Sequence, residues 1–120
     1  MIKRVVIAGC RDYNNYDKAK AYIDCCLCDI IEDNEIVIVS GGACGADALG
    51  ERYAKEKGFK LEKYPADWKK YGRSAGPKRN EQMAKICDCV ICFWDGKSRG
   101  TRSMIEYAKK YGKPVRIKNI

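Results

Sequence analysis

The sequence predicts one α/β domain of the Rossmann type, with three layers: a mostly parallel five-stranded sheet and helices on both of its faces. Three observations favour this fold. Short runs rich in β-branched residues alternate with segments whose apolar residues recur at helical spacing. Glycine-rich turns follow several of these runs, and no linker or repeat interrupts them. The length of 120 residues is close to the commonest domain size, so residues 1–120 are expected to form a single domain.

Five runs are the expected strands: Lys3–Ala8, Glu35–Ser40, Lys60–Tyr64, Asp88–Trp94 and Val115–Lys118. Four segments between them carry apolar residues on one helical face: Asp17–Glu32, the stretch from about Ala46 to Gly58, the stretch from Pro77 to about Ile86, and Arg102–Tyr111. Residues Pro65–Gly76 are expected to form a polar loop. Pro77 suits the first turn of a helix, because the N–H that it lacks is not needed there.

The composition excludes a disordered chain and a membrane-embedded one. Hydrophobic residues make up 46% of the chain and charged residues 33%, as in ordinary globular domains. No apolar run approaches the roughly 18 residues that a spanning helix needs, so no membrane partner is expected. The eight cysteines lie in apolar segments, and Met1–Ala8 is interpreted as a strand rather than a signal peptide. The cysteines are therefore expected to be free thiols, and the cytoplasm is the expected location.

Positive charge is concentrated in the second half of the chain. Residues 1–59 carry 8 basic and 10 acidic side chains, whereas residues 60–120 carry 16 basic and 6 acidic ones. A basic half attracts anions, either phosphorylated small molecules or nucleic acid. Charge alone does not choose between these two partners.

Three loops at the ends of expected strands hold most of the unusual residues: Gly9–Tyr13, Ser40–Asp47 and Asp95–Thr101. In a parallel sheet such loops meet at one edge, where ligands bind if the strand order reverses. Glycines let the backbone approach a ligand closely, and the free amides of a helix N-terminus favour a phosphate. Neither glycine-rich loop matches a Walker motif or the dinucleotide fingerprint. A phosphate site at this edge is the interpretation that explains all three loops together.

Several of these residues also have a simpler explanation. A glycine after a parallel strand is often only a tight turn, and Asp47 at a helix start could merely complement the helix dipole. Trp68 could pack against the sheet edge instead of stacking on a base. Cys10 and Cys44 lie where a helix N-terminus would lower a thiol pKa, but the chain has no histidine to serve as a base. Small packing residues are the favoured interpretation of both cysteines.

The order of motifs resembles a known family. The motifs are Ser40-Gly41-Gly42 with Gly45-Ala46-Asp47, Pro65-Ala66-Asp67-Trp68, Tyr71-Gly72-Arg73, Ala75 to Asn80 with Met83, Phe93-Trp94-Asp95-Gly96 and Ser98-Arg99-Gly100-Thr101. Together they resemble the YspA/YpsA-related branch of the SLOG superfamily over nearly the whole chain. The resemblance implies a Rossmann-like domain of a bacterium or phage that binds nucleotides or nucleotide-derived signals. Relatives of that branch include cytokinin-activating phosphoribohydrolases and the DNA-processing protein of natural transformation.

One departure from the phosphoribohydrolase pattern argues against hydrolysis. The resemblance matches Arg79 to an arginine of those enzymes, and Gly100-Thr101 to their phosphate-binding loop. Met104 stands where their catalytic glutamate would be. Glu106 is two residues further on, roughly 200° around the helix, and so is expected to point elsewhere.

The leading hypothesis is a module that binds a nucleotide or an ADP-ribose-like compound as a sensor or sequestering protein. The glycines and Thr101 would hold phosphate, the arginines would supply charge, Asp47 and Asp95 would accept ribose hydroxyls, and Trp68 would take the base. The candidate ligand-binding residues are Gly9, Arg11, Ser40, Gly41, Gly42, Gly45, Asp47, Trp68, Arg73, Arg79, Asn80, Asp95, Gly96, Ser98, Arg99, Gly100 and Thr101. No cofactor is expected. No metal is expected either, because neither of the two cysteine groups contains two Cys-x-x-Cys pairs; the groups are Cys25, Cys26 and Cys28, and Cys87, Cys89 and Cys92.

Two alternatives remain open. The first is an enzyme that cleaves a ribose–base bond with Asp47 or Asp95 in place of the missing glutamate. The second is single-stranded DNA binding, which the basic half of the chain suggests but which no row of interleaved aromatic residues supports. A homo-oligomer is plausible, although no segment of the sequence marks an interface.

Overall fold

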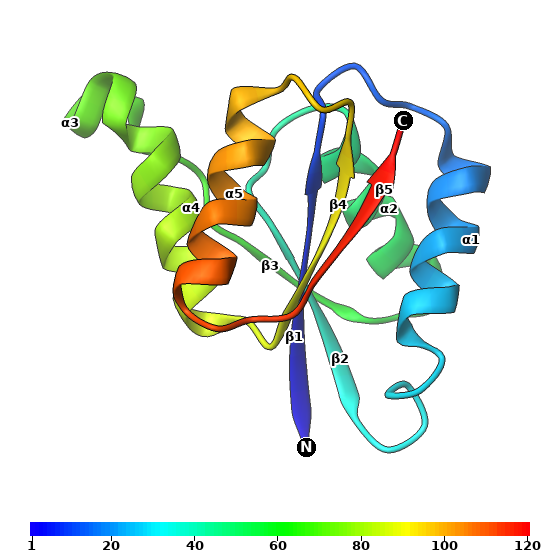
Figure 1. The fold of residues 1–120 in the computed structure, drawn as a ribbon. Coiled ribbons are helices and arrows are strands. Elements are labelled where there is room, and N and C mark those ends of the chain that lie inside the picture. Colours follow the sequence, from blue (N-terminus) through cyan, green and yellow to red (C-terminus); the bar gives the residue numbers. More distant parts are fainter.

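The computed structural model describes residues 1–120 as a parallel sheet between two layers of helices (Figure 1). The strands are β1 (Ile2–Gly9), β2 (Glu35–Ser40), β3 (Lys60–Lys63), β4 (Cys89–Trp94) and β5 (Val115–Asn119). The helices are α1 (Tyr16–Leu27), α2 (Ala46–Lys57), the short α3 (Trp68–Tyr71), α4 (Ala75–Ile86) and α5 (Arg99–Lys110). The predicted three-layer α/β domain with a five-stranded sheet is confirmed, and every strand pair is parallel.

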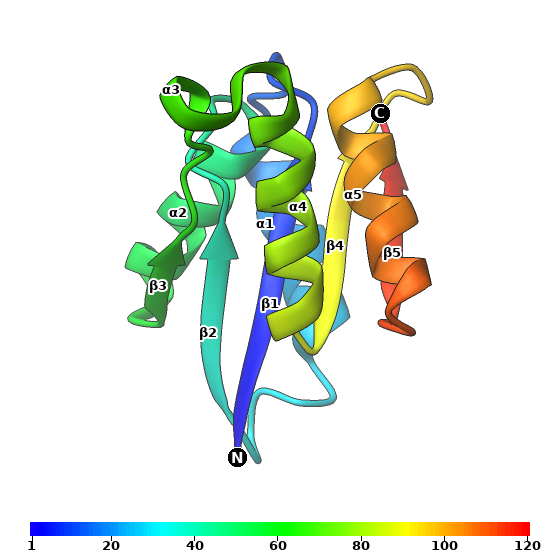
Figure 2. The same cartoon turned by 90° about the vertical axis from the view of Figure 1, so that its left-hand side faces the viewer.

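Strand alternation divides the core into two halves. Helices α1 and α2 lie on one face of the sheet, and α4 and α5 lie on the other (Figures 1 and 2). On β1, Val5 and Ile7 pack with the first pair of helices, whereas Val6 and Ala8 pack with the second pair. Because both faces of the inner strands are covered, their residues form nearly continuous apolar runs. This burial explains why the strands could be recognised from sequence.

The strand order β3-β2-β1-β4-β5 places β1 at the centre of the sheet. The chain first builds outward from β1 to β3, and then crosses to the other side of β1 to build β4 and β5. The strand order therefore reverses between β1 and β4. At such a point the loops leaving the two strands diverge, and a crevice opens outside their carboxyl ends.

Helix α1 is shorter than the sequence predicts. It ends at Leu27 rather than at Glu32, and the segment that follows forms turns in which Ile31 is 36% exposed. Carboxylates at Asp29 and Asp33 follow the last turn, which contains no basic residue. Negative charge is unfavourable at the C-terminal end of a helix dipole, so the helix stops before it.

Two other boundaries correct the sequence interpretation. The expected polar loop of Pro65–Gly76 contains α3, a 3₁₀ turn and the start of α4, because the Asp67 side chain accepts a hydrogen bond from the Lys70 amide and caps α3. Helix α5 begins at Arg99, three residues earlier than expected, because Ser98 caps it by accepting from the Thr101 amide. Residues 99–101 are thus a first helical turn rather than a loop.

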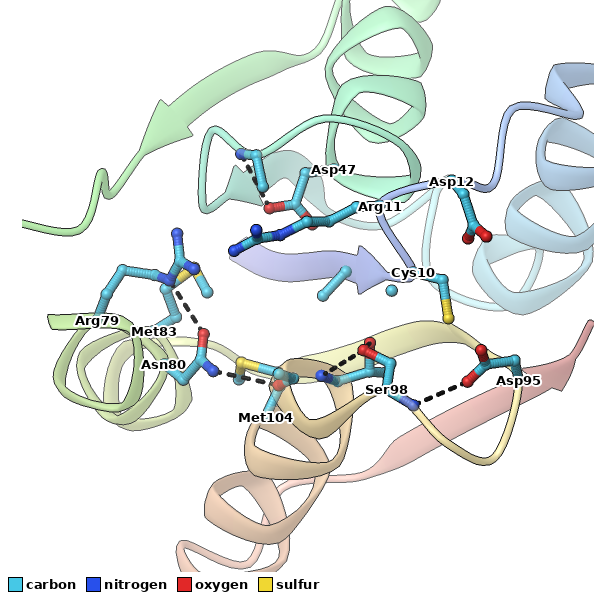
Figure 3. Close-up of a pocket in the computed structure, with 15 residues that line it drawn as sticks. Cys10, Arg11, Asp12, Asp47, Arg79, Asn80, Met83, Asp95, Ser98 and Met104 are labelled. Carbon is cyan, nitrogen blue, oxygen red and sulfur yellow. Dashed lines mark hydrogen bonds between the residues drawn. The ribbon is translucent and has the colours of Figure 1, made fainter. Parts of the chain in front are cut away.

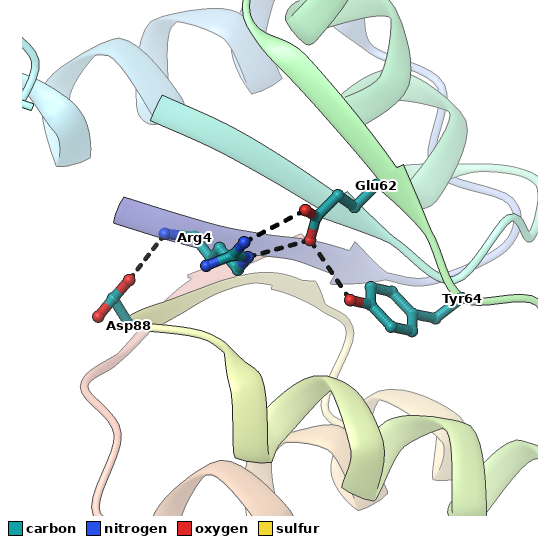
Figure 4. Close-up of polar contacts among 4 residues, drawn as sticks. All are labelled: Arg4, Glu62, Tyr64 and Asp88. Atoms are coloured by element: carbon teal, nitrogen blue, oxygen red, sulfur yellow. Dashed lines mark hydrogen bonds and ion pairs between the residues drawn. The ribbon is translucent and has the colours of Figure 1, made fainter. Parts of the chain in front are cut away.

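Polar side chains of Arg4, Glu62 and Tyr64 form a cluster that links β1 with β3 and the residue after it (Figure 4). The Arg4 Nε donates to the Glu62 carboxylate at 3.1 Å, and the Tyr64 hydroxyl donates to the same carboxylate at 3.3 Å. The Arg4 amide donates to Asp88 at 2.8 Å. These contacts link β1 to β3 across β2, and they fix Asp88, the residue that precedes β4.

The structure also bears on the expected free thiols and on the expectation that no helix spans a membrane. All eight cysteines are free thiols. None of the helices combines the length and the apolar character that crossing a membrane requires.

Close contact between α2 and β1 depends on a glycine in the middle of the helix. A Cβ atom at Gly50 would lie 2.8 Å from the Cβ of Ile7, which is closer than such atoms approach in proteins. Gly100, in the first turn of α5, has no neighbour within 4 Å of the same position. An added methyl group would therefore clash with Ile7 at Gly50 but would contact nothing at Gly100.

We expect Gly50→Ala to destabilise the domain by about 1–3 kcal/mol, because α2 must shift away from β1. Gly100→Ala is the matched control and should be neutral or stabilising by at most about 1 kcal/mol, since alanine favours the helix. Denaturant unfolding of both variants measures the difference. Equal stability of the two variants would contradict the packing described here.

Candidate functional site

A cavity of about 350 Å³ lies at the carboxyl ends of β1 and β4, where the strand order reverses (Figure 3). Four segments contribute its walls: the end of β1, the loop and first turn of α2, one side of α4, and the loop and first turns of α5. The lining residues are Ala8, Gly9, Cys10, Arg11, Asp12, Ala43, Asp47, Arg79, Asn80, Met83, Asp95, Ser98, Gly100, Thr101 and Met104.

Arg79 reaches from α4 across the edge of the sheet to the loop after β2. Its Nη1 donates to the carbonyl oxygen of Gly41 at 2.6 Å, and its Nε donates to Asn80 Oδ1 at 3.0 Å. A guanidinium has five N–H donors, so three remain for other partners. A Cβ at Gly41 would lie 2.7 Å from Arg79 Cζ, so a side chain there would displace the guanidinium from this position.

Arg11 faces Arg79 across the cavity (Figure 3). Burial lowers the pKa of Arg79, the nearby Asp47 opposes this effect, and the charge of Arg11 lowers that pKa further. An arginine keeps its charge in proteins, so two guanidinium groups share one small space. An anion bound between them would relieve their repulsion.

Asp47 is a buried carboxyl group at the same site. It is 6% exposed and accepts a hydrogen bond from the Ala43 amide at 3.2 Å. Burial raises the pKa of Asp47 to about 6, although the Ala43 amide and Arg79 favour the charged form. Asp47 can therefore hold or release a proton near neutral pH, as a candidate acid or base must.

The first turn of α5 supplies free backbone donors. Ser98 Oγ accepts from the amide and the hydroxyl of Thr101, at 3.5 and 3.2 Å. The first amides of a helix have no partner within it, and the cap leaves those of Arg99 and Gly100 available. Such amides, with the helix dipole behind them, form a binding site for an anion.

Asp95 stabilises the turn that leads into α5. Its Oδ1 accepts from the amides of Lys97 and Ser98, at 2.8 and 2.9 Å, and these two bonds lower the pKa of its carboxyl group. On the other side of the helix start, Asn80 Nδ2 donates to the Gly100 carbonyl at 3.3 Å. The helix start is thus fixed from both sides, which pre-positions its free amides.

Cys10 does not have the lowered pKa that its place beside a helix N-terminus suggests. The side chain is buried, with 3% exposed, and burial raises the pKa of its thiol. Three or more histidine, cysteine, aspartate or glutamate side chains in a metal-binding arrangement occur nowhere in the structure.

The structure brings most of the predicted site residues together. Nine of them line the cavity: Gly9, Arg11, Asp47, Arg79, Asn80, Asp95, Ser98, Gly100 and Thr101. Four more line two adjoining hollows that share Arg11 and Arg79 with the cavity: Gly41, Gly42, Trp68 and Arg99. Trp68 is 53% exposed there and belongs to neither core cluster.

Four predicted residues lie outside these hollows. Ser40 is fully buried, where its hydroxyl donates to Glu51 at 2.8 Å and accepts from the Gly42 amide at 3.1 Å. Gly45 and Gly96 adopt φ angles of +73° and +82°, which suit glycine in turns. Arg73 is exposed on the 3₁₀ turn beyond α3. Ser40 and the two glycines shape the loops.

Six lining residues were not among the predicted ligand-binding residues: Ala8, Cys10, Asp12, Ala43, Met83 and Met104. Met83 lies one helical turn after Arg79, so the spacing of α4 was an available signal. Met104 lines the cavity, whereas the exposed Glu106 pairs with Arg102 at 3.1 Å. As expected from the helical spacing, Glu106 lies outside the cavity.

Fold and site together define a Rossmann-like domain with a cavity at the strand reversal, lined by two arginines and by the first turn of α5. The chain belongs to the YspA, cpYpsA-related SLOG family, whose profile matches residues 3–71. It is 34% identical to the Gene 61 protein of Mycobacterium phage D29 over 122 residues, which cover 95% of this chain and 94% of that protein. The resemblance seen in the sequence is therefore confirmed.

Solved structures of DNA processing protein A (DprA) share the fold. The protein from Streptococcus pneumoniae superposes with a TM-score of 0.73 at 23% identity, over 98% of this chain and 50% of that one. The protein from Helicobacter pylori, solved to describe its single-stranded DNA binding mode, superposes with a TM-score of 0.67 at 24% identity, over 96% of this chain and 64% of that one. This chain thus spans only part of either DprA, and the likeness establishes the fold.

The raised pKa of Asp47 predicts a pH dependence of stability. Its pKa is about 6 in the folded state and about 3.9 in an unfolded chain, so the folded state binds more protons between these values. The wild type should therefore lose on the order of 2 kcal/mol of unfolding free energy, relative to Asp47→Asn, as pH rises from 4 to 7. Denaturant unfolding across this range measures the loss.

The comparison with Asp47→Asn is needed because Glu56, Glu81 and Asp95 have lowered pKa values and act in the opposite direction. Their effect is common to both proteins and cancels in the difference. Parallel stability curves for wild type and variant would show that Asp47 is not a titrating buried group.

Proposed function

We propose that the cavity binds the phosphate of a nucleotide-type small molecule. The observation that carries this proposal is the convergence of Arg11, Arg79 and the free first-turn amides of α5 on one small space. Each of these groups favours an anion, and the two guanidinium groups repel each other without one. The cavity also lies at the strand reversal, where Rossmann-like sheets bind ligands.

Trp68 is the proposed partner of the base. It is the side chain with the largest apolar surface beside the arginines, and its ring borders hollows lined by Arg11, Arg79 and Arg99. Aromatic rings stack on nucleobases because every base offers a π face. An exposed tryptophan next to a phosphate site therefore suits a nucleotide better than inorganic phosphate alone.

The carboxylates in the cavity restrict the ligand further. Asp12, Asp47 and Asp95 line the same space as the two arginines, so the lining is not uniformly positive. Carboxylates repel phosphate but accept hydrogen bonds from hydroxyl groups. A ribose beside the phosphate would fit this division of charge.

Arg79→Gln is expected to weaken binding of AMP and ADP-ribose by about 10- to 100-fold, because charge-assisted hydrogen bonds contribute roughly 1.5–3 kcal/mol. Arg102→Gln is the matched control: Arg102 lies exposed on α5 and pairs only with Glu106. Isothermal titration calorimetry at fixed salt measures both variants. Absence of nucleotide binding by the wild type, or equal affinity of Arg79→Gln, would refute the proposed site.

Cleavage of a ribose–base bond is a second candidate, favoured only by Asp47. This buried carboxyl, with a pKa of about 6, is placed to exchange a proton with a ligand in the cavity. Chromatography of the titrated samples separates the two activities, because an enzyme releases free base and a binding module leaves its ligand intact.

Single-stranded DNA binding is a third candidate, because the fold is shared with a DprA whose structure describes that activity. The segment around α3 favours it: Trp68 and Tyr71 are exposed, and Lys70 and Lys78 lie over the Tyr71 ring. A DNA-binding surface predicts affinity that rises with strand length and falls steeply with salt. A mononucleotide site predicts neither dependence on length nor a steep salt slope.

A further inference from the structure

The cavity at the strand reversal, with Arg11 and Arg79 in its lining, is called the phosphate cavity, and a second cavity of about 890 Å³ adjoins it. It lies between α1 and the carboxyl end of β5, and it shares Asp12 and Asp95 with the first cavity. Tyr22 and Lys18 of α1 form one side, and Lys118 of β5 forms the other. We call this space the α1–β5 groove.

The groove exists because α1 does not cover the edge strand. Val115 and Ile117 of β5 pack against the α5 side of the sheet, so the alternate residue Lys118 faces the α1 side and is exposed. Helix α1 instead packs over the central strands, where Ile23 and Leu27 are buried. The outer face of β5 on this side is therefore open.

The groove has an aromatic wall beside positive charge. The Tyr22 ring lies edge-on to Phe93, with centroids 5.8 Å apart, and the Lys118 Nζ lies 5.8 Å from the Tyr22 ring centroid. Lys18 adds a second cation. An aromatic ring with cations around it suits a flat, electron-rich ring such as a nucleobase.

Four groups of side chains, of three chemical kinds, follow one another along this edge of the sheet. Trp68 borders hollows that share Arg11 and Arg79 with the phosphate cavity, and that cavity shares Asp12 and Asp95 with the α1–β5 groove. The order is aromatic ring, arginines, carboxylates, aromatic ring. The matching ligand has a base, phosphate, ribose hydroxyls and a second ring in that order.

We infer that the ligand is a dinucleotide whose two nucleosides are joined 5′ to 5′ through a pyrophosphate, with its second ring in the α1–β5 groove against Tyr22. This inference rests on the proposed function and names the class of ligand for the same site. The carboxylates of Asp12 and Asp95, where the two cavities meet, accept the hydroxyl groups of the second ribose.

The same carboxylates disfavour a DNA strand along this path. Within a strand, deoxyribose has no free hydroxyl, and every sugar is followed by another phosphate. That phosphate would face Asp12 and Asp95. In a 5′–5′ pyrophosphate the 2′ and 3′ hydroxyls of both riboses are free.

Calorimetric titration with AMP, ADP-ribose and diadenosine pyrophosphate tests the inference. ADP-ribose adds a second phosphate and a second ribose to AMP, and diadenosine pyrophosphate adds the second base, which would enter the α1–β5 groove. Diadenosine pyrophosphate is expected to bind the wild type at least tenfold more tightly than ADP-ribose. Tyr22→Leu should abolish this advantage and leave the affinities for AMP and ADP-ribose within twofold of wild type. Tyr107→Leu is the matched control, because Tyr107 is a half-buried tyrosine on α5 outside both cavities.

Lys118→Glu is a second test that leaves the core intact, since Lys118 is exposed. It should weaken the binding of diadenosine pyrophosphate at least threefold more than the binding of AMP.

The inference is overturned if the wild type binds diadenosine pyrophosphate no more tightly than ADP-ribose, or if both variants keep the tighter binding of diadenosine pyrophosphate. It is also overturned if Tyr22→Leu weakens the binding of all three ligands equally. It is also overturned if a short DNA strand binds more tightly than the dinucleotide. Binding of AMP without a dinucleotide gain overturns this inference alone, whereas no nucleotide binding overturns the proposed function as well.

Discussion

The contact of Arg79 with the Gly41 carbonyl joins the two helical layers at the edge of the sheet that holds the cavity. Arg79 belongs to α4 on one face, and Gly41 precedes α2 on the other. The sheet order brings these segments to the same edge, and the missing side chain of Gly41 lets the guanidinium pass over the loop. The shape of the cavity and the burial of its charges both depend on this crossing.

The groups that favour an anion and the carboxylates Asp12 and Asp95 lie in different parts of the cavity. The arginines and the first turn of α5 favour an anion, whereas Asp12 and Asp95 lie where the cavity opens into the α1–β5 groove. Asp47 sits between these groups, with burial opposing its ionisation. A ligand that carries phosphate and hydroxyl groups side by side suits this arrangement better than a simple polyanion does.

Much of this edge could be predicted from sequence, because parallel strands bring their following loops together. Glycine runs after apolar strands and an arginine near a helix start were visible signals, and they led to Arg79 and Gly41. The role of Ser40 was not visible, because its partner Glu51 lies eleven residues away on α2. The α1–β5 groove could not be predicted either, since it requires the placement of β5 beside β4 and the packing of α1 over the central strands. Local patterns predict elements and loop positions, whereas side-chain partners and uncovered faces depend on the assembled layers.

Amide chemical shifts during titration with AMP would test most directly whether phosphate binds at the strand reversal. The account predicts that the amides of Arg99 and Gly100, at the start of α5, shift most. Amides at the opposite edge of the sheet, such as those of Glu35 and Gly112, should not move. Saturable shifts confined to the first group would support the site. Shifts centred elsewhere, or none at millimolar AMP, would contradict it.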